Sequence, residues 1–236
     1  MSPLRTYILL SLLISGFLIC AGCTQSAPAT TQATPSAGTA TMTQSAEAQK
    51  LVKLETNMGT ITIALAPDMP VTAGNFESLV KKGYYDGVIF HRVINGFMIQ
   101  GGDPDSKTAK PGQALGSGGE KYTVDAEFNP ALIHKKGALA AARTENPTKA
   151  SSSCQFYIVQ GQKVDPARLT DHGGVPYTDA QKEIYKTVGG TPFLDMSYTV
   201  FGQITEGLDV IDKIATQPKD RNDRPLKDIK MTVTIL

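Results

Sequence analysis

The chain has 236 residues, and its 23 Lys and Arg against 22 Asp and Glu give a formal net charge of +1. Because it has neither a basic excess nor a basic run, the sequence gives no support for binding nucleic acid. Of its 3 cysteines only Cys154 lies beyond the first 23 residues, so no disulfide is expected in the rest of the chain.

Residues 1–22 have the pattern of an export signal. Arg5 supplies a positive start, and residues 7–21 are apolar or small throughout, a run shorter than the roughly 20 residues that span a bilayer. Small residues then precede Cys23, which resembles the lipobox of prokaryotic lipoproteins, although Cys20 stands where Leu is usual. We therefore predict a protein outside the cytoplasm, anchored to the cell membrane by lipid on Cys23, since two acyl chains give a stable anchor. If this interpretation is wrong, the protein is secreted.

Residues 23–50 are predicted to be the lipidated Cys and a flexible tether. Residues 24–46 carry no charge and consist mainly of Thr, Ala, Ser, Gln and Pro. Such a segment cannot bury enough apolar surface to offset the loss of conformational entropy. Residues 51–236 have a globular composition and are numerous enough for one domain with a sizeable core.

The globular part alternates in the manner of strands. Residues 52–56 and 61–65 flank a turn and predict a hairpin, and residues 229–235 predict a last strand. Helical periodicity, with Pro near the start, predicts a helix over 70–82, and a second short helix is predicted over 206–215. Many short strands with two separated helices favour a mainly β, closed antiparallel barrel over a parallel sheet.

Residues 161–192 form a predicted insert on the surface. Thr178 and Gln181 have the spacing of a capping box, so a helix is expected to start there, and Gly189-Gly190 would end it. The insert is either decoration or a lip that shapes which peptides reach a neighbouring pocket. We favour decoration.

The segment Phe90–Asp103, FHRVINGFMIQGGD, concentrates the candidate functional residues. It opens like a strand and closes on a glycine pair that permits a tight turn. Arg92, two large apolar side chains and an amide fall within nine positions. This composition predicts an apolar pocket with a guanidinium donor at its rim. The alternative is a buried strand with Arg92 as an ordinary surface charge.

Three ordered motifs carry a resemblance to a known family. FHRVINGFMIQGGD resembles the signature of the cyclophilin peptidyl-prolyl isomerases, residues 153–158 (SCQFYI) resemble a second strand motif, and residues 193–202 resemble a later pocket wall. The resemblance extends from about Leu51 to the C-terminus. It implies a closed barrel of eight antiparallel strands with a helix over each open end, and isomerase activity on Xaa-Pro peptide bonds without cofactor or metal.

The resemblance also implies the site. Arg92 matches the catalytic residue. The residues that match the substrate-binding positions are Phe97, Met98, Gln100, Ala142, Tyr157, Phe193, Leu194 and Tyr198. Gln100 is expected to orient Arg92 and the substrate backbone. Phe193 stands where many members have a Trp that contacts cyclosporin, so weak or no cyclosporin binding is expected.

These observations lead to a predicted function and its competitor. The leading hypothesis is an isomerase that assists the folding of exported or surface proteins by rotating Xaa-Pro bonds in proline-containing segments. The competitor is a non-catalytic chaperone or scaffold module that binds the same segments. His91, His134 and His172 have no ligand-type spacing to one another or to Cys154, so no metal site is predicted, and we assign these histidines structural roles.

Overall fold

The computed structural model describes residues 49–236. The predicted signal, the lipidation site Cys23 and nearly all of the tether lie outside these residues. The first elements are β1 (Leu51–Thr56) and β2 (Gly59–Leu65), which pair as the predicted antiparallel hairpin. The helix α1 (Pro70–Lys81) follows and begins with proline, whose fixed φ and missing N–H suit the first turn.

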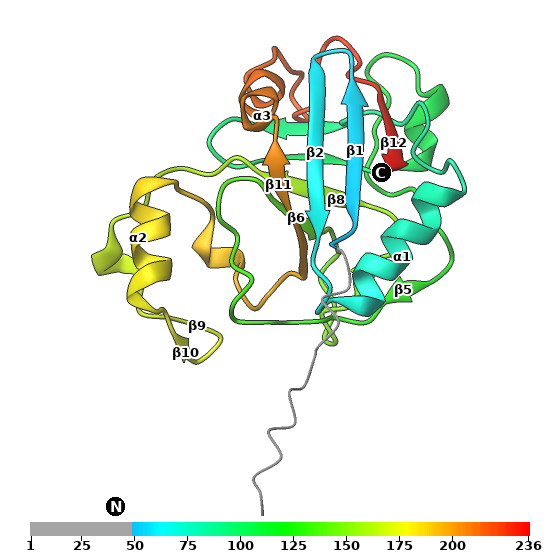
Figure 1. The fold of residues 1–236 in the computed structure, drawn as a ribbon. Coiled ribbons are helices and arrows are strands. Elements are labelled where there is room, and N and C mark those ends of the chain that lie inside the picture. Colours follow the sequence, from blue (N-terminus) through cyan, green and yellow to red (C-terminus); the bar gives the residue numbers. More distant parts are fainter. Residues whose placement is uncertain (1–48) are drawn as a thin grey trace, which may run out of the picture. The chain divides into compact units, whose positions relative to one another are not determined.

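The main sheet has eight strands in the order β12-β1-β2-β11-β6-β8-β4-β3, and every pairing is antiparallel. The remaining bounds are β3 (Arg92–Ile94), β4 (Met98–Gly101), β6 (Ala138–Ala141), β8 (Phe156–Val159), β11 (Val200–Glu206) and β12 (Met231–Ile235). This confirms the predicted eight-stranded antiparallel fold (Figure 1).

The sheet curls until its two edges approach each other. No ladder joins β3 to β12. Instead, three backbone hydrogen bonds connect the segment before β3 with the segment around the start of β12: Gly87 and Phe90 donate to the carbonyls of Met231 and Ile229, and Met231 donates to Val88. The curled sheet is therefore closed by an irregular segment and not by a strand ladder.

Shorter elements complete the chain. They are the 3-10 turns η1 (Pro104–Thr108), η2 (Pro166–Arg168) and η3 (Pro192–Leu194), the pairs β5 (Thr123–Val124) with β7 (Ser151–Ser152) and β9 (Asp171–His172) with β10 (Val175–Pro176), and the helices α2 (Asp179–Thr187) and α3 (Leu208–Ala215). None of the helices within residues 49–236 is long and apolar enough to cross a membrane.

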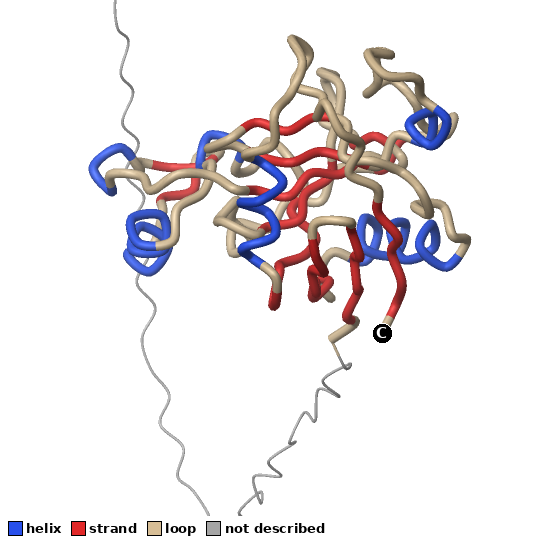
Figure 2. The backbone as a smooth tube through the Cα atoms, turned by 90° about the horizontal axis from the view of Figure 1, so that it is seen from above, coloured by secondary structure: helices blue, strands red, loops and turns tan. Residues whose placement is uncertain are grey.

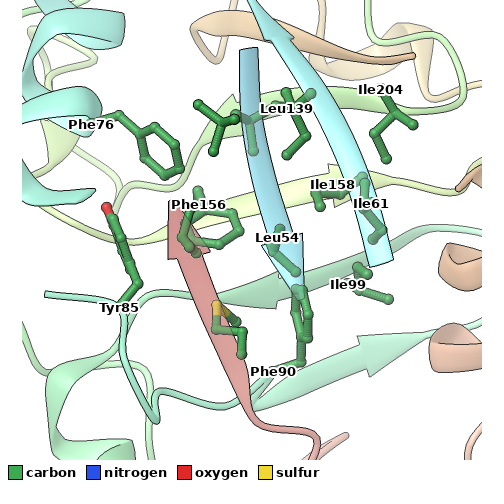
Figure 3. Close-up of a cluster of buried hydrophobic side chains, with 14 of the residues drawn as sticks. Leu54, Ile61, Phe76, Tyr85, Phe90, Ile99, Leu139, Phe156, Ile158 and Ile204 are labelled. Atoms are coloured by element: carbon green, nitrogen blue, oxygen red, sulfur yellow. The ribbon is translucent and has the colours of Figure 1, made fainter. Parts of the chain in front are cut away.

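The inside of the curled sheet is filled by apolar side chains. Alternate residues of each strand point inward, because successive side chains of a strand face opposite sides. Phe156 lies among aromatic neighbours, with its ring centroid 5.6 Å from that of Phe76 and 5.5 Å from that of Tyr85. Figure 3 shows these rings together with Leu54, Ile99 and other inward residues. Fully burying each such side chain stabilises the fold by roughly 1.5–3 kcal/mol.

Two helices cover this core, as predicted. The helix α1 packs against β11 and β12, and α3 packs against β2, β3 and β4. In Figure 1, α3 lies near the upper end of β2, and α1 lies beside the lower part of the sheet.

The insert forms a lobe at the side of the sheet away from α1, as Figures 1 and 2 show. It contains the predicted helix, α2. Thr178 accepts a hydrogen bond from Gln181 N, and the Gln181 side chain accepts one from Thr178 N, so the predicted capping box is confirmed. A small apolar cluster joins the lobe to the segment before β6: Leu169, Tyr177 and Tyr185 of the lobe pack with Ile133.

Candidate active site

The candidate site lies on the outer face of the sheet. The register places Arg92 opposite Gln100, Gln100 opposite Tyr157, and Tyr157 opposite Ala140. Residues that pair across neighbouring strands share one face. Because their sequence neighbours Val93, Ile99, Ile158 and Leu139 belong to the interior cluster, this row must face outward. Alternate residues of each strand therefore face the core, and the residues between them face the site.

A hollow of about 100 Å³ opens on this face. The residues that line it are Arg92, Phe97, Met98, Gln100, Ala142, Arg143, Tyr157, Leu194 and Tyr198. The structure thus brings eight of the nine residues predicted from the sequence into one hollow, and it adds Arg143. Met98 and Tyr157 are buried in its floor. Ala138 and Ala140 pack in the same cluster, where their small side chains leave room above the sheet.

Phe193, the ninth predicted residue, lies at the rim and does not line the hollow. Its side chain is 71% exposed. Its ring packs against that of Phe97, with centroids 5.7 Å apart. The turn η3 contains both Phe193, at the rim, and Leu194, in the lining of the hollow.

Arg92 is the cation with the most available donors in the hollow. Its side chain is 43% exposed, and its Nε lies 3.8 Å from Asp223 Oδ2. That separation is too long for a hydrogen bond. Asp223 is in turn held at 2.8 Å by Lys219. The guanidinium is therefore steadied by a nearby carboxylate, yet it makes no side-chain hydrogen bond within residues 49–236.

Gln100 is fixed by a partner that sequence analysis did not find. Its Nε2 donates to Gln155 Oε1 at 3.1 Å, and Gln155 Nε2 donates to the carbonyls of Gly116 and Gly118 at 2.9 and 2.8 Å. Gln100 makes no hydrogen bond to Arg92, its cross-strand neighbour, so the expected direct orientation of Arg92 is not seen. The amide is instead held by the loop around Gly116, with its Oε1 left as an acceptor.

The glycine pair of the signature has a steric role beside this amide. Gly102 has φ +95°, and a side chain there would collide with the backbone of Cys154. Only glycine fits such a close approach in this backbone region. Asp103 follows this turn, and its carboxylate accepts hydrogen bonds from Gly116 N and Gly118 N. These hydrogen bonds fix the loop whose carbonyls hold Gln155.

Tyr157 is anchored from behind by a buried polar network. Its hydroxyl lies 2.9 Å from His134 Nε2, and His134 Nδ1 lies 2.7 Å from Asp195 Oδ1. Tyr177 and Tyr185 donate to Asp195 Oδ2 at 2.8 and 2.6 Å. Because an ionised carboxylate only accepts, Nδ1 carries the proton of the His–Asp hydrogen bond. A wall of the hollow is thus tied to two tyrosines of the insert.

Burial and hydrogen bonding fix the charge states of the tyrosines and of Asp195 in this network. Burial raises the pKa of Tyr157 and of Tyr185 above the ordinary value. Burial also pushes the pKa of Asp195 upward, but hydrogen bonds from His134 and Tyr185 outweigh it and leave that pKa below its usual range. Asp195 is therefore ionised and the tyrosines are neutral at physiological pH, which suits a chain of fixed donors and acceptors.

Arg143 extends the polar side of the hollow. Its guanidinium carbon lies 4.5 Å from the centroid of the Tyr198 ring, within the range of a cation–π contact, and its Nε donates to the Ser197 carbonyl at 3.1 Å. Tyr198 in turn packs edge-on against Tyr157 at 5.9 Å. These contacts fix the ring of Tyr198 at the mouth of the hollow.

Comparison with known proteins agrees with this geometry. Residues 51–235 match the family described as cyclophilin type peptidyl-prolyl cis-trans isomerase/CLD. The chain belongs to the cyclophilin family. It is a cyclophilin-type peptidyl-prolyl cis-trans isomerase.

Its relatives include bacterial proteins that carry the name of a peptidyl-prolyl cis-trans isomerase. One from Staphylococcus saprophyticus is 40% identical over 180 residues, which cover 75% of this chain and 86% of the relative. One from Staphylococcus aureus is 41% identical over 186 residues, covering 75% and 87%.

Solved structures of the family share the fold. A Cryptosporidium parvum cyclophilin superposes with a TM-score of 0.60 and 26% identity, covering 80% of this chain and 98% of that chain. A second structure of it, obtained in the presence of the dipeptide Ala-Pro, has a TM-score of 0.59 and 27% identity, covering 79% and 98%.

Proposed function

We propose that this isomerase acts on proline-containing segments of exported or surface proteins while a lipid on Cys23 anchors it outside the cytoplasm. The export-signal pattern, the small residues before Cys23 and the uncharged stretch after it support this location. The tether would let the domain turn freely and reach clients beyond the membrane surface. The hollow around Arg92 supports the proline-binding part of the proposal.

The chemistry needs a twisted amide to be stabilised. Partial double-bond character opposes rotation about the Xaa-Pro bond with a barrier of about 18–20 kcal/mol. Midway through rotation the prolyl nitrogen becomes pyramidal, and its lone pair becomes available. A cation aimed at that lone pair stabilises the twisted state more than either planar state, so it lowers the barrier. Lowering it by about 7 kcal/mol accelerates rotation roughly 10⁵-fold.

Five side chains of the hollow have a part in this proposal. Phe97, Met98 and Leu194 hold the proline ring on an apolar surface while the preceding carbonyl turns. Arg92 supplies the cation, and its permanent charge and planar fork suit the task better than an ammonium would. Gln100 offers its free Oε1 to a substrate backbone N–H. The observation that carries the proposal is the partly exposed guanidinium of Arg92, which makes no side-chain hydrogen bond within residues 49–236 and lies beside a buried apolar floor.

The experiment is an exchange measurement. The cis/trans exchange rate of an Ala-Pro-Phe type peptide is followed by NMR exchange spectroscopy with the protein and with Arg92→Ala. Arg221→Ala is the matched control, since this exposed arginine does not line the hollow. We expect fast exchange that falls at least a hundredfold in Arg92→Ala and is unchanged in Arg221→Ala.

Two other results of the exchange measurement would contradict the assignment of catalysis to Arg92. Exchange at the uncatalysed rate, with peptide resonances that still shift on binding, would favour the non-catalytic binding module. Fast exchange that survives Arg92→Ala would assign the decisive group elsewhere in the hollow.

The membrane anchor has its own test. When the full chain is expressed in a bacterial host supplied with radiolabelled fatty acid, label and membrane association are expected with Cys23 and absent with Cys23→Ser. Unlabelled protein in the culture medium would instead support secretion.

We propose weak or no binding of cyclosporin. Phe193, at the rim, stands where many cyclophilins have a Trp, and an indole would add contact area and a donor. Titration calorimetry should show tighter binding by Phe193→Trp than by the unaltered protein. Equal affinity of the two proteins for cyclosporin would mean that Phe193 is not the cause of weak binding.

A further inference from the structure

A second hollow lies next to the first. It encloses about 540 Å³ between the insert and the turn that joins β3 to β4, and Phe193, Gly96 and Thr191 belong to its lining. Its far wall comes from residues 162–171 of the insert and from Tyr177. It is several times larger than the hollow around Arg92, and no part of the proline-binding proposal uses it.

The two hollows share a wall. Phe97 lines the first hollow, and Phe193, whose ring packs against Phe97, lines the second. Leu194, the next residue on η3, lines the first. The exposed ring of Phe193 therefore forms a ridge between them. A peptide whose proline lies against Phe97 reaches the second hollow with residues only a short distance along its chain, since an extended chain advances about 3.3 Å per residue.

The second hollow is preformed. Gln162 and Gly190 exchange two backbone hydrogen bonds, and Thr191 N donates to the His134 carbonyl. Gln181 Nε2 donates to the Pro130 carbonyl, which ties α2 back to the barrel. The buried hydrogen bonds of Tyr177 and Tyr185 to Asp195 add to this anchoring. A wall that is already ordered loses little entropy when a peptide binds, which favours affinity.

Two cationic side chains of this hollow have hydrogen-bond donors that no other group of the described residues uses. Asp165 and Asp171 each accept a hydrogen bond from a nearby backbone N–H, those of Ala167 and Gly174. Lys163 and Arg168 are exposed and make no ion pair or side-chain hydrogen bond within residues 49–236. The lining therefore carries two cations and two carboxylates, and its unused hydrogen-bond donors are those of Lys163 and Arg168. They match a carboxylate of a peptide.

We infer that the second hollow is an extension of the substrate site. It takes residues that flank the isomerised proline in the same client chain, and Lys163 and Arg168 favour segments with an acidic residue at that point. The insert is then a selectivity element of the enzyme, in contrast to the decoration that sequence analysis favoured. This inference rests on the proposed binding of proline in the hollow around Arg92.

The test compares peptides of different length. The full chain is assayed by NMR exchange with a tetrapeptide centred on Ala-Pro and with decapeptides that carry two Asp residues either before or after the same Ala-Pro. We expect KM for one of the decapeptides to be roughly three- to tenfold below that for the tetrapeptide, with kcat unchanged. The difference should shrink at high salt, because exposed charges are screened.

Charge reversal locates the effect. Lys163→Glu combined with Arg168→Glu should remove the advantage of the acidic decapeptide and leave KM for the tetrapeptide unchanged. Lys227→Glu is the matched control, since Lys227 is exposed, unpaired within the described part of the chain and absent from both hollows. The control should keep the advantage.

Several results would overturn the inference. Equal KM for the tetrapeptide and both decapeptides would mean that the second hollow is not used. Loss of the advantage in Lys227→Glu as well would mean a nonspecific effect of net charge. A tetrapeptide that is not isomerised at all is a different result, because it would contradict the proposed chemistry at Arg92 and not the extension.

Discussion

The two faces of the main sheet are built from the same strands and meet opposite demands. The inner face buries Val93, Ile99 and Ile158 among apolar neighbours, so it stabilises the fold through close packing. The outer face carries Arg92, Gln100 and Tyr157, whose positions depend on hydrogen bonds and charges. The comparison teaches that stability and activity are separable here, because alternate residues of one strand serve different purposes.

Substituting one residue on each face tests whether stability and activity are separable. Phe156→Ala removes a fully buried ring from the inner face, which should lower the free energy of unfolding by about 3–5 kcal/mol. Arg92→Ala should leave that free energy within about 0.5 kcal/mol, since Arg92 is partly exposed and only loosely paired. Urea unfolding measures both. A large loss of stability in Arg92→Ala would mean that the outer face also maintains the fold.

A buried histidine just before β3 should make the protein sensitive to acid. His91 is 4% exposed, and neither of its ring nitrogens has a hydrogen-bond partner in the structure. Burial lowers its pKa from 6.5 to about 4, Asp103 opposes this shift, and the charges of Arg92 and Arg224 assist it. The imidazole is therefore neutral in the folded protein at physiological pH.

The sign of the pH effect follows from this shift. Between pH 6.5 and pH 4 the unfolded chain binds a proton at His91 that the folded protein does not bind, so stability falls as the pH is lowered through this window. The shift of about 2.5 units corresponds to roughly 3 kcal/mol. In His91→Leu no proton can bind at this position. The decrease in the free energy of unfolding between pH 6.5 and pH 4 should therefore be roughly 3 kcal/mol smaller than in the unaltered protein. Identical pH profiles for both proteins would contradict this assignment.

The network behind Tyr157 combines features of the two faces, since it is polar and yet buried. Tyr185→Phe removes one of two hydroxyl donors to Asp195 Oδ2 and should lower the free energy of unfolding by about 1–3 kcal/mol. Tyr177→Phe removes the other. The double variant should lose more than the sum of the single losses, because only then is Oδ2 left without a donor. Additive losses in denaturant unfolding would mean that the two hydroxyls act independently.

Sequence patterns were enough to predict the hairpin of β1 and β2, the last strand and the helices, and the family resemblance implied the count of eight strands and eight of the residues that line the hollow. Alternation reveals strands, and the motif around Arg92 reveals the residues that register later brings together. The buried network was not predicted, because His134 and Asp195 are 61 positions apart and nothing local pairs them. Tyr157 did give a signal: a hydroxyl on a buried ring needs a partner. Gln155 and Arg143 were missed as site residues for the same reason as His134, since their partners come from distant loops.

The smallest expected effect tests whether the insert is an independent unit beside the sheet. Thr178 caps α2, and Thr178→Ala should destabilise that helix by about 1 kcal/mol. Amide hydrogen exchange in α2 should then quicken about fivefold, with no change in β6 or β8. Thr170→Ala, at an exposed threonine of the same insert, should leave exchange unaltered everywhere. If exchange quickens equally in α2 and in β8, the hydrogen bonds of Tyr177 and Tyr185 to Asp195 unite the insert with the sheet in one cooperative unit.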